Sequence, residues 1–91
     1  MDALAGLTDS VSSMAFVGAL IDEIRLRRRL PSPDDRRAIR VAAGVSLAAM
    51  AAELGVAGPT VGRWEAGRQP RGELLEQYVT LLESLQIEMA S

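Results

Sequence analysis

Apolar residues recur at steps of three and four along much of the chain, the spacing that places side chains on one face of an α-helix. The pattern is clearest over residues 9–30 and 73–89. The apolar positions of the first stretch are Met14, Val17, Ile21 and Ile24. Those of the second are Leu74, Leu75, Tyr78, Leu81, Leu82, Leu85 and Met89. Both stretches predict amphipathic helices.

Helix start and stop signals divide the sequence between these two stretches. Ser32 precedes a proline and two aspartates, a combination typical of a helix N-terminus, and Gly44 supplies a left-handed C-cap. Ser46 begins the next predicted helix and Gly55 ends it, while Gly67 ends a further short one. The predicted helices cover residues 9–30, 33–43, 47–54, 58–66 and 73–89. We therefore expect an all-α fold, a compact bundle of about five helices, behind a flexible N-terminus at residues 1–8.

Composition narrows the chemistry open to this chain. Its 91 residues allow one modest core, and it contains neither cysteine nor histidine. The usual zinc ligands and histidine acid/base chemistry are therefore missing, and we expect no metal, no cofactor and no enzymatic activity. No apolar run approaches the roughly 18 residues of a membrane span, and the acidic N-terminus does not resemble a secretory signal. We expect a soluble, cytoplasmic protein that does not bind membranes.

Charge is distributed unevenly along the chain. The net charge is −2, yet residues 22–40 carry seven arginines against four acids. Residues 58–71 add Arg63, Arg68 and Arg71 against one glutamate. The charged residues of the segment 72–91 are all acidic. A basic middle between acidic ends suits a protein with a single DNA-facing side, although solvated helix faces would give the same pattern.

Three small or apolar residues are spaced as two steeply crossing helices require. Ala51 lies in the third predicted helix, Gly55 follows four residues later, and Val61 follows six beyond that. Such helices need a small residue at their contact, a glycine in the turn and an apolar residue that fills the gap. The spacing indicates a helix-turn-helix unit over residues 46–67.

Residues 40–70 resemble the helix-turn-helix of the Xre family, the Cro and lambda-type repressors. The run Thr60-Val61-Gly62-Arg63-Trp64-Glu65-Ala66-Gly67 is the most specific part of the match. The other matching positions are Arg40, Gly44, Ser46, Met50, Ala51, Leu54, Gly55, Val56 and Pro70. With flanking helices the resemblance covers roughly residues 33–85, so we expect a helix-turn-helix domain over residues 33–91 with a long C-terminal helix.

The resemblance implies a role for each matching position. The helix at 58–66 would be the recognition helix, with Gly58, Pro59, Gly62 and Arg63 toward bases and Thr60 near the backbone. Gly58 and Pro59 replace side chains that usually bond to bases, so readout would depend mainly on Arg63, whose guanidinium suits guanine. Leu47 stands where the family often has a phosphate-binding glutamine.

Other positions are expected to bind phosphate or to hold the fold together. Ser46 is a further DNA-contact candidate, and Arg68 and Arg71 are natural phosphate clamps. Arg36 and Arg37 are secondary candidates for the same role. Arg40 and Glu65 match a family ion pair with a structural role, and Trp64 is expected in the core against the final helix.

Residues 9–30 lie outside the minimal family domain. Their apolar stripe has a coiled-coil-like spacing, so this helix either covers the core or forms a dimer contact. The leucine-rich C-terminal helix could equally serve as the dimer surface. Arg25, Arg27, Arg28 and Arg29 either reach flanking DNA or are solvated.

We therefore expect a sequence-specific transcriptional regulator, a phage or prophage repressor or Cro-like protein, that binds double-stranded operator DNA as a homodimer. The alternative is a protein-interaction module, or the antitoxin of a toxin–antitoxin pair, with weak or no DNA binding. Two features motivate that alternative: the acidic total charge, and the residues Gly58, Pro59 and Leu47 at positions where the family usually has polar side chains that contact DNA.

Overall fold

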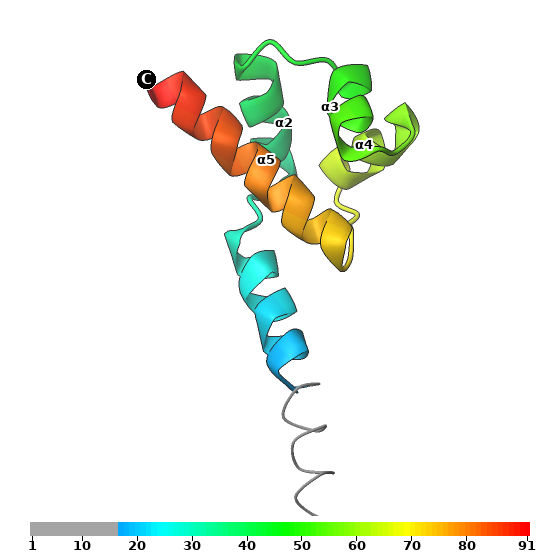
Figure 1. The fold of residues 1–91 in the computed structure, drawn as a ribbon. Coiled ribbons are helices and arrows are strands. Elements are labelled where there is room, and N and C mark those ends of the chain that lie inside the picture. The colour runs from blue at the N-terminus through cyan, green and yellow to red at the C-terminus, as the bar shows by residue number, and fades with distance from the viewer. Residues whose placement is uncertain (1–16) are drawn as a thin grey trace, which may run out of the picture.

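Helix α5 crosses the molecule, and three shorter helices gather along it in the computed structural model (Figure 1). The structure describes residues 17–91, which contain five helices and no strand. The first helix is described over residues 17–29. The others are α2 (Pro33–Ala42), α3 (Leu47–Leu54), α4 (Gly58–Glu65) and α5 (Glu73–Ala90). The predicted all-α bundle is confirmed, while the expectations for residues 1–8 and for Met14 lie outside the described residues.

Local signals set the ends of α2 and α3. The Ser32 hydroxyl accepts a hydrogen bond from the Asp35 amide at 3.3 Å, and the Ser46 hydroxyl accepts one from the Ala49 amide at 3.0 Å. Each cap pairs an amide that has no partner inside its helix. Gly55 has φ +68°, a left-handed conformation that ends α3 and turns the chain toward α4. Helix α2 ends at Ala42, one residue before the predicted end.

The core lies where α5 meets the other helices. Tyr78, Leu75, Val79 and Leu82 of α5 are fully buried, and Trp64 of α4 is nearly so. The rings of Trp64 and Tyr78 lie 4.8 Å apart between centroids at a tilt of 45°. Trp64 therefore packs against the final helix, as predicted. The predicted stripe of α5 is too long, because Met89 is 56% exposed near the end of the helix.

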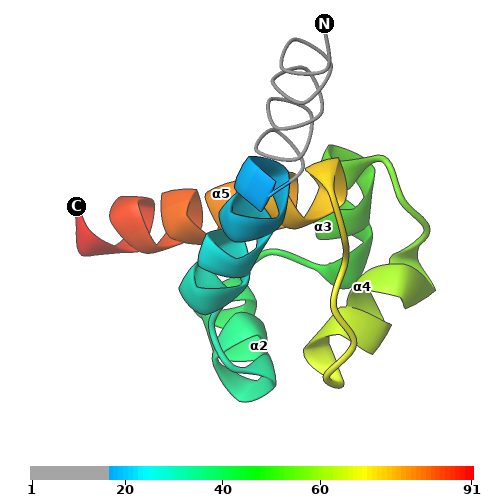
Figure 2. The same cartoon turned by 90° about the horizontal axis from the view of Figure 1, so that it is seen from below.

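The first helix extends away from the bundle in Figure 1, and Figure 2, seen from below, shows it in front of α5. It contacts the core through its C-terminal part, where Leu30 is buried and Leu26 packs at the edge. Arg29 pairs with Glu83 of α5, with Nη2 2.5 Å from Oε1. The alternative in which this helix covers the core is therefore wrong for Val17, Ile21 and Ile24, which are exposed. None of the helices described over residues 17–91 combines the length and the apolar character needed to cross a membrane.

Candidate nucleic-acid interface

Helices α3 and α4 pack closely on each other and are joined by a three-residue turn. Ala51 of α3 and Val61 of α4 are both buried, and the Val56 amide donates to the Ala51 carbonyl at 2.9 Å. The small residue, the glycine turn and the apolar plug thus occupy the places that their spacing indicates. Helix α4 is held by its inner face, which leaves its other face open.

The open face of α4 carries the predicted base-facing positions. Arg63 and Pro59 are exposed, while Gly58, Thr60 and Gly62 are half-buried. A Cβ atom added at Gly58 or Gly62 would meet nothing within 4 Å, so the helix surface there is bare backbone. Arg63 is the charged side chain of this face, and its contact with DNA stays a prediction.

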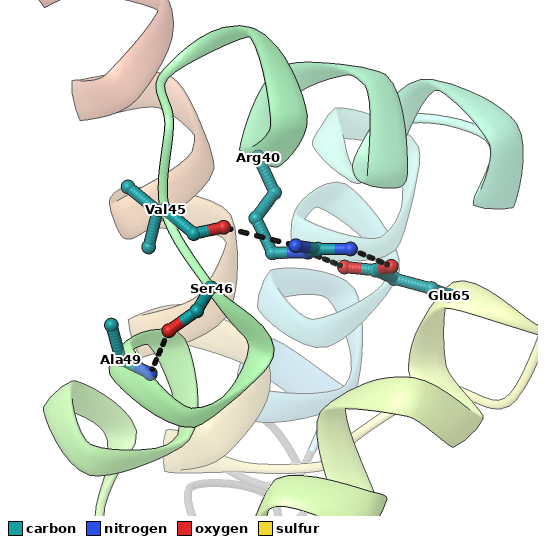
Figure 3. Close-up of polar contacts among 5 residues, drawn as sticks. All are labelled: Arg40, Val45, Ser46, Ala49 and Glu65. Carbon is teal, nitrogen blue, oxygen red and sulfur yellow. Dashed lines mark hydrogen bonds and ion pairs between the residues drawn. The ribbon is translucent and has the colours of Figure 1, made fainter.

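Two further predicted contacts follow α4 in the loop that leads to α5. Arg68 and Arg71 are both exposed, and their contacts with phosphate stay predictions. Ser46 is also exposed, at the start of α3, but its hydroxyl already accepts the capping hydrogen bond from Ala49 (Figure 3). The Ser46 hydroxyl can still accept one more hydrogen bond. Its contact with DNA stays a prediction.

Arg40 and Glu65 are brought together between α2 and α4 (Figure 3). Arg40 Nε lies 2.5 Å and Nη2 3.0 Å from the two carboxylate oxygens, and Nη1 donates to the Val45 carbonyl at 2.9 Å. The side chains are only 12% and 8% exposed, so the pair is well shielded from water. The hydrogen bond to Glu65 raises the pKa of Arg40 above its ordinary value. The pair fixes the C-terminal end of α4 against α2.

Arg36 has a role that the sequence does not predict. Its side chain is 3% exposed, and its guanidinium donates to the carbonyls of Pro31, Trp64 and Arg68 at 2.8, 2.7 and 3.2 Å. Burial lowers its pKa. The prediction that Arg36 contacts phosphate is wrong, because its side chain is buried and its guanidinium donates its hydrogen bonds to backbone carbonyls inside the fold. The sequence feature that could have indicated its inward position is its spacing of four residues from Arg40, which places both arginines on the same face of α2.

Arg37, the next residue, does point outward. It is exposed and borders a shallow hollow of about 400 Å³ between α2 and α4. Leu47 at the start of α3 and Gly62 of α4 line the same hollow. An arginine beside a helix N-terminus is an arrangement that favours a phosphate group, since both offer N–H donors. A phosphate contact by Arg37 thus stays a prediction, at a place where Leu47 offers no polar group.

Within residues 17–91, no group of three carboxylates or other metal-binding side chains is close enough to hold a metal ion. The sequence model of the helix-turn-helix domain family matches residues 37–91, which include α3, α4 and α5. Comparison with curated proteins and with solved structures gave no match. The family match covers more than half of the chain and contains the whole helix-turn-helix unit.

Proposed function

Because the chain belongs to the helix-turn-helix domain family, of the Xre and Cro type, we propose that it is a sequence-specific DNA-binding transcriptional regulator. Helix α4 lies in the major groove in this proposal, and regulation is repression by occupation of promoter DNA. The observation that carries the proposal is the two-sided character of α4. Val61 and Trp64 fix its inner face in the core, while Arg63 projects from its outer face.

Arg63 provides the direct readout. A guanidinium on an exposed recognition-helix face can donate two parallel hydrogen bonds to guanine O6 and N7. One such contact discriminates by roughly 1–3 kcal/mol, which is too little for a unique operator. A homodimer on a palindromic operator makes the contact twice, and DNA shape adds to it at bases that Gly58 and Pro59 do not read.

Exposed arginines around α4 supply the phosphate contacts. Arg68 and Arg71 follow its C-terminal end, and Arg37 lies near its middle beside Gly62. Helix α5 carries four of the twelve acidic residues, Glu73, Glu76, Glu83 and Glu88, and no arginine. The surface proposed to face DNA is therefore basic although the chain as a whole is acidic.

Recovery of the operator by genome-wide binding, followed by mobility shifts on that sequence, tests the proposal. Arg63→Ala is expected to abolish the preference for the operator over scrambled DNA. Arg63→Lys is the matched variant, because it keeps the charge but loses the fork that pairs with guanine. It should bind DNA with similar salt dependence and reduced discrimination. Operator preference retained in Arg63→Ala would disprove the proposed readout.

The second candidate is a protein-interaction module or antitoxin that keeps the fold with weak DNA binding. The observation in its favour is the bare surface at Gly58 and Gly62, where the recognition helix offers no polar side chain. Salt separates the two candidates, because phosphate neutralisation releases counterions and makes affinity fall steeply with salt. No DNA binding at low salt, together with a co-purifying partner protein, would favour this second candidate.

A further inference from the structure

Gly62 forms part of the wall of the shallow hollow of about 400 Å³ between α2 and α4. It lies inside α4 without the positive φ that glycine adopts readily, and a Cβ atom added there would meet nothing within 4 Å. Neither the backbone conformation nor the internal packing therefore requires glycine at this position. Because the hollow lies against this bare main chain, a side chain at position 62 would narrow it.

The charges around the hollow suit an anion. Arg37 is exposed on α2 and lines it from that side. Glu65 also lines it, but its carboxylate is only 8% exposed and accepts two hydrogen bonds from Arg40. The pairing neutralises the carboxylate that would otherwise repel a negatively charged group. The charge that the hollow presents to a visitor is therefore that of Arg37.

Apolar side chains form another part of the wall. Leu47, at the start of α3, is half-buried, and Ala66 directly follows α4. These side chains offer contact to C–H groups and no hydrogen bond. A free phosphate ion would use only the charge of Arg37, whereas a deoxyribose joined to a phosphate would use the apolar wall as well. The lining thus fits a sugar–phosphate unit of a DNA strand better than a free anion.

We propose that this hollow seats one sugar–phosphate unit of the DNA backbone, which passes over the bare main chain of Gly62. Its phosphate lies at Arg37 and its deoxyribose lies against Leu47 and Ala66. The proposal rests on the proposed function, because it takes α4 to lie in the major groove, where a DNA backbone runs alongside the helix. It assigns Gly62 the role of admitting the strand, and it gives Leu47 an apolar contact with DNA. Such contacts add affinity and fix the orientation of the protein without reading sequence, which remains the role of Arg63.

Fluorescence anisotropy of the full chain on operator and scrambled duplexes, over a range of salt concentrations, tests the proposal. Gly62→Ala removes no charge, but its Cβ should keep the strand away from the hollow. Affinity for both duplexes should fall about tenfold, and the slope of log affinity against log salt should fall by about 1, because Arg37 no longer reaches its phosphate. A loss of stability alone would not change that slope. Unchanged affinity and slope overturn the proposal, and so does a loss confined to operator preference, since the Cβ would then meet a base edge.

Gly18→Ala is the matched control. Gly18 lies on the first helix, where it is exposed and an added Cβ also meets nothing within 4 Å. The same substitution should there leave both affinity and slope unchanged. An equal loss of affinity in Gly18→Ala would overturn the role assigned to Gly62.

A double variant tests whether Gly62 and Arg37 serve the same nucleotide. Arg37→Ala alone should lower the slope by about 1, and in the Gly62→Ala background it should lower it no further, because the phosphate contact is already lost. Additive effects on the slope overturn the proposal. If the unaltered chain prefers the operator and Gly62→Ala behaves like it, this proposal fails and the proposed function stands. If the unaltered chain binds no DNA, both fail.

Discussion

Arg36 Nη1 donates a 2.7 Å hydrogen bond to the backbone carbonyl of Trp64, which joins α2 to the C-terminal end of α4. Trp64 lies in the last turn of α4, where carbonyl groups have no partner inside the helix. The same guanidinium also reaches the Arg68 carbonyl in the loop beyond. One buried cation thus ties the end of α4 to the start of the loop that carries the exposed arginines.

Replacement of Arg36 should therefore destabilise the fold. Arg36→Met removes the hydrogen bonds to the carbonyls of Pro31, Trp64 and Arg68, and we expect the free energy of unfolding to fall by about 2–4 kcal/mol. Arg37→Met, at the exposed neighbouring position, should change it by less than about 0.5 kcal/mol. Urea unfolding followed by tryptophan fluorescence measures both. Equal stability of the two variants would contradict the role assigned to Arg36.

The coupling energy between Arg40 and Glu65 should exceed that between the exposed Arg29 and Glu83, although the shortest nitrogen–oxygen distance is 2.5 Å in both pairs. Loss of one member of the shielded pair leaves the other charge uncompensated, at an expected cost of about 3 kcal/mol for Arg40→Met or Glu65→Gln. The double variant should cost clearly less than the two single changes added together. Double-mutant cycles on both pairs, read by urea unfolding, test this. Additive effects at Arg40 and Glu65 would refute it.

The sequence predicts those features that depend on neighbouring residues. The Ser32 and Ser46 caps and the Gly55 turn are local, and the helix bounds predicted from them agree with the structure within about one residue. The pairing of Arg40 with Glu65 came from the family resemblance. The burial of Arg36 was not predicted, because it depends on carbonyl groups 28 and 32 residues away. The orientation of the first helix was also left open, since tertiary contacts at Leu26 and Leu30 decide which of its faces is covered.

Tyr78 should ionise only at strongly alkaline pH. Its burial raises the pKa of the phenol from 10.0 to about 12. The unfolded chain loses this proton near pH 10 while the folded chain keeps it, so the free energy of unfolding should fall as the pH rises from about 10 to about 12. Ultraviolet absorbance of the tyrosinate follows the ionisation directly, because Tyr78 is the sole tyrosine. A midpoint near 10 in the folded protein would contradict this burial.

Tyr78→Phe provides the control for that titration. The hydroxyl of Tyr78 is buried and finds no hydrogen-bond partner among residues 17–91. Its removal should therefore leave stability unchanged or raise it by about 1 kcal/mol, and the alkaline loss of stability should disappear. A loss of more than about 1 kcal/mol would mean that the hydroxyl is bonded in solution.

Arg68→Ala should weaken DNA binding in a way that does not depend on sequence. Removal of one phosphate contact should lower the slope of log affinity against log salt by about 1, for operator and scrambled DNA alike. Gln69→Ala, at the exposed and uncharged neighbouring position, should leave the slope unchanged. Fluorescence anisotropy over a range of salt concentrations measures the slopes. An unchanged slope in Arg68→Ala would remove Arg68 from the proposed phosphate contacts.

Gly55 and Gly62 should respond in opposite directions to the same substitution. An added Cβ meets nothing within 4 Å at either position, so steric contact with other parts of the fold does not distinguish them. Gly55 has φ +68°, which L-residues disfavour, and Gly55→Ala should destabilise by about 1–2 kcal/mol. Gly62 lies inside α4, where alanine favours the helix, and Gly62→Ala should stabilise by about 0.5–1 kcal/mol. Thermal unfolding by circular dichroism measures both, and a gain of stability in Gly55→Ala would contradict the left-handed turn between α3 and α4.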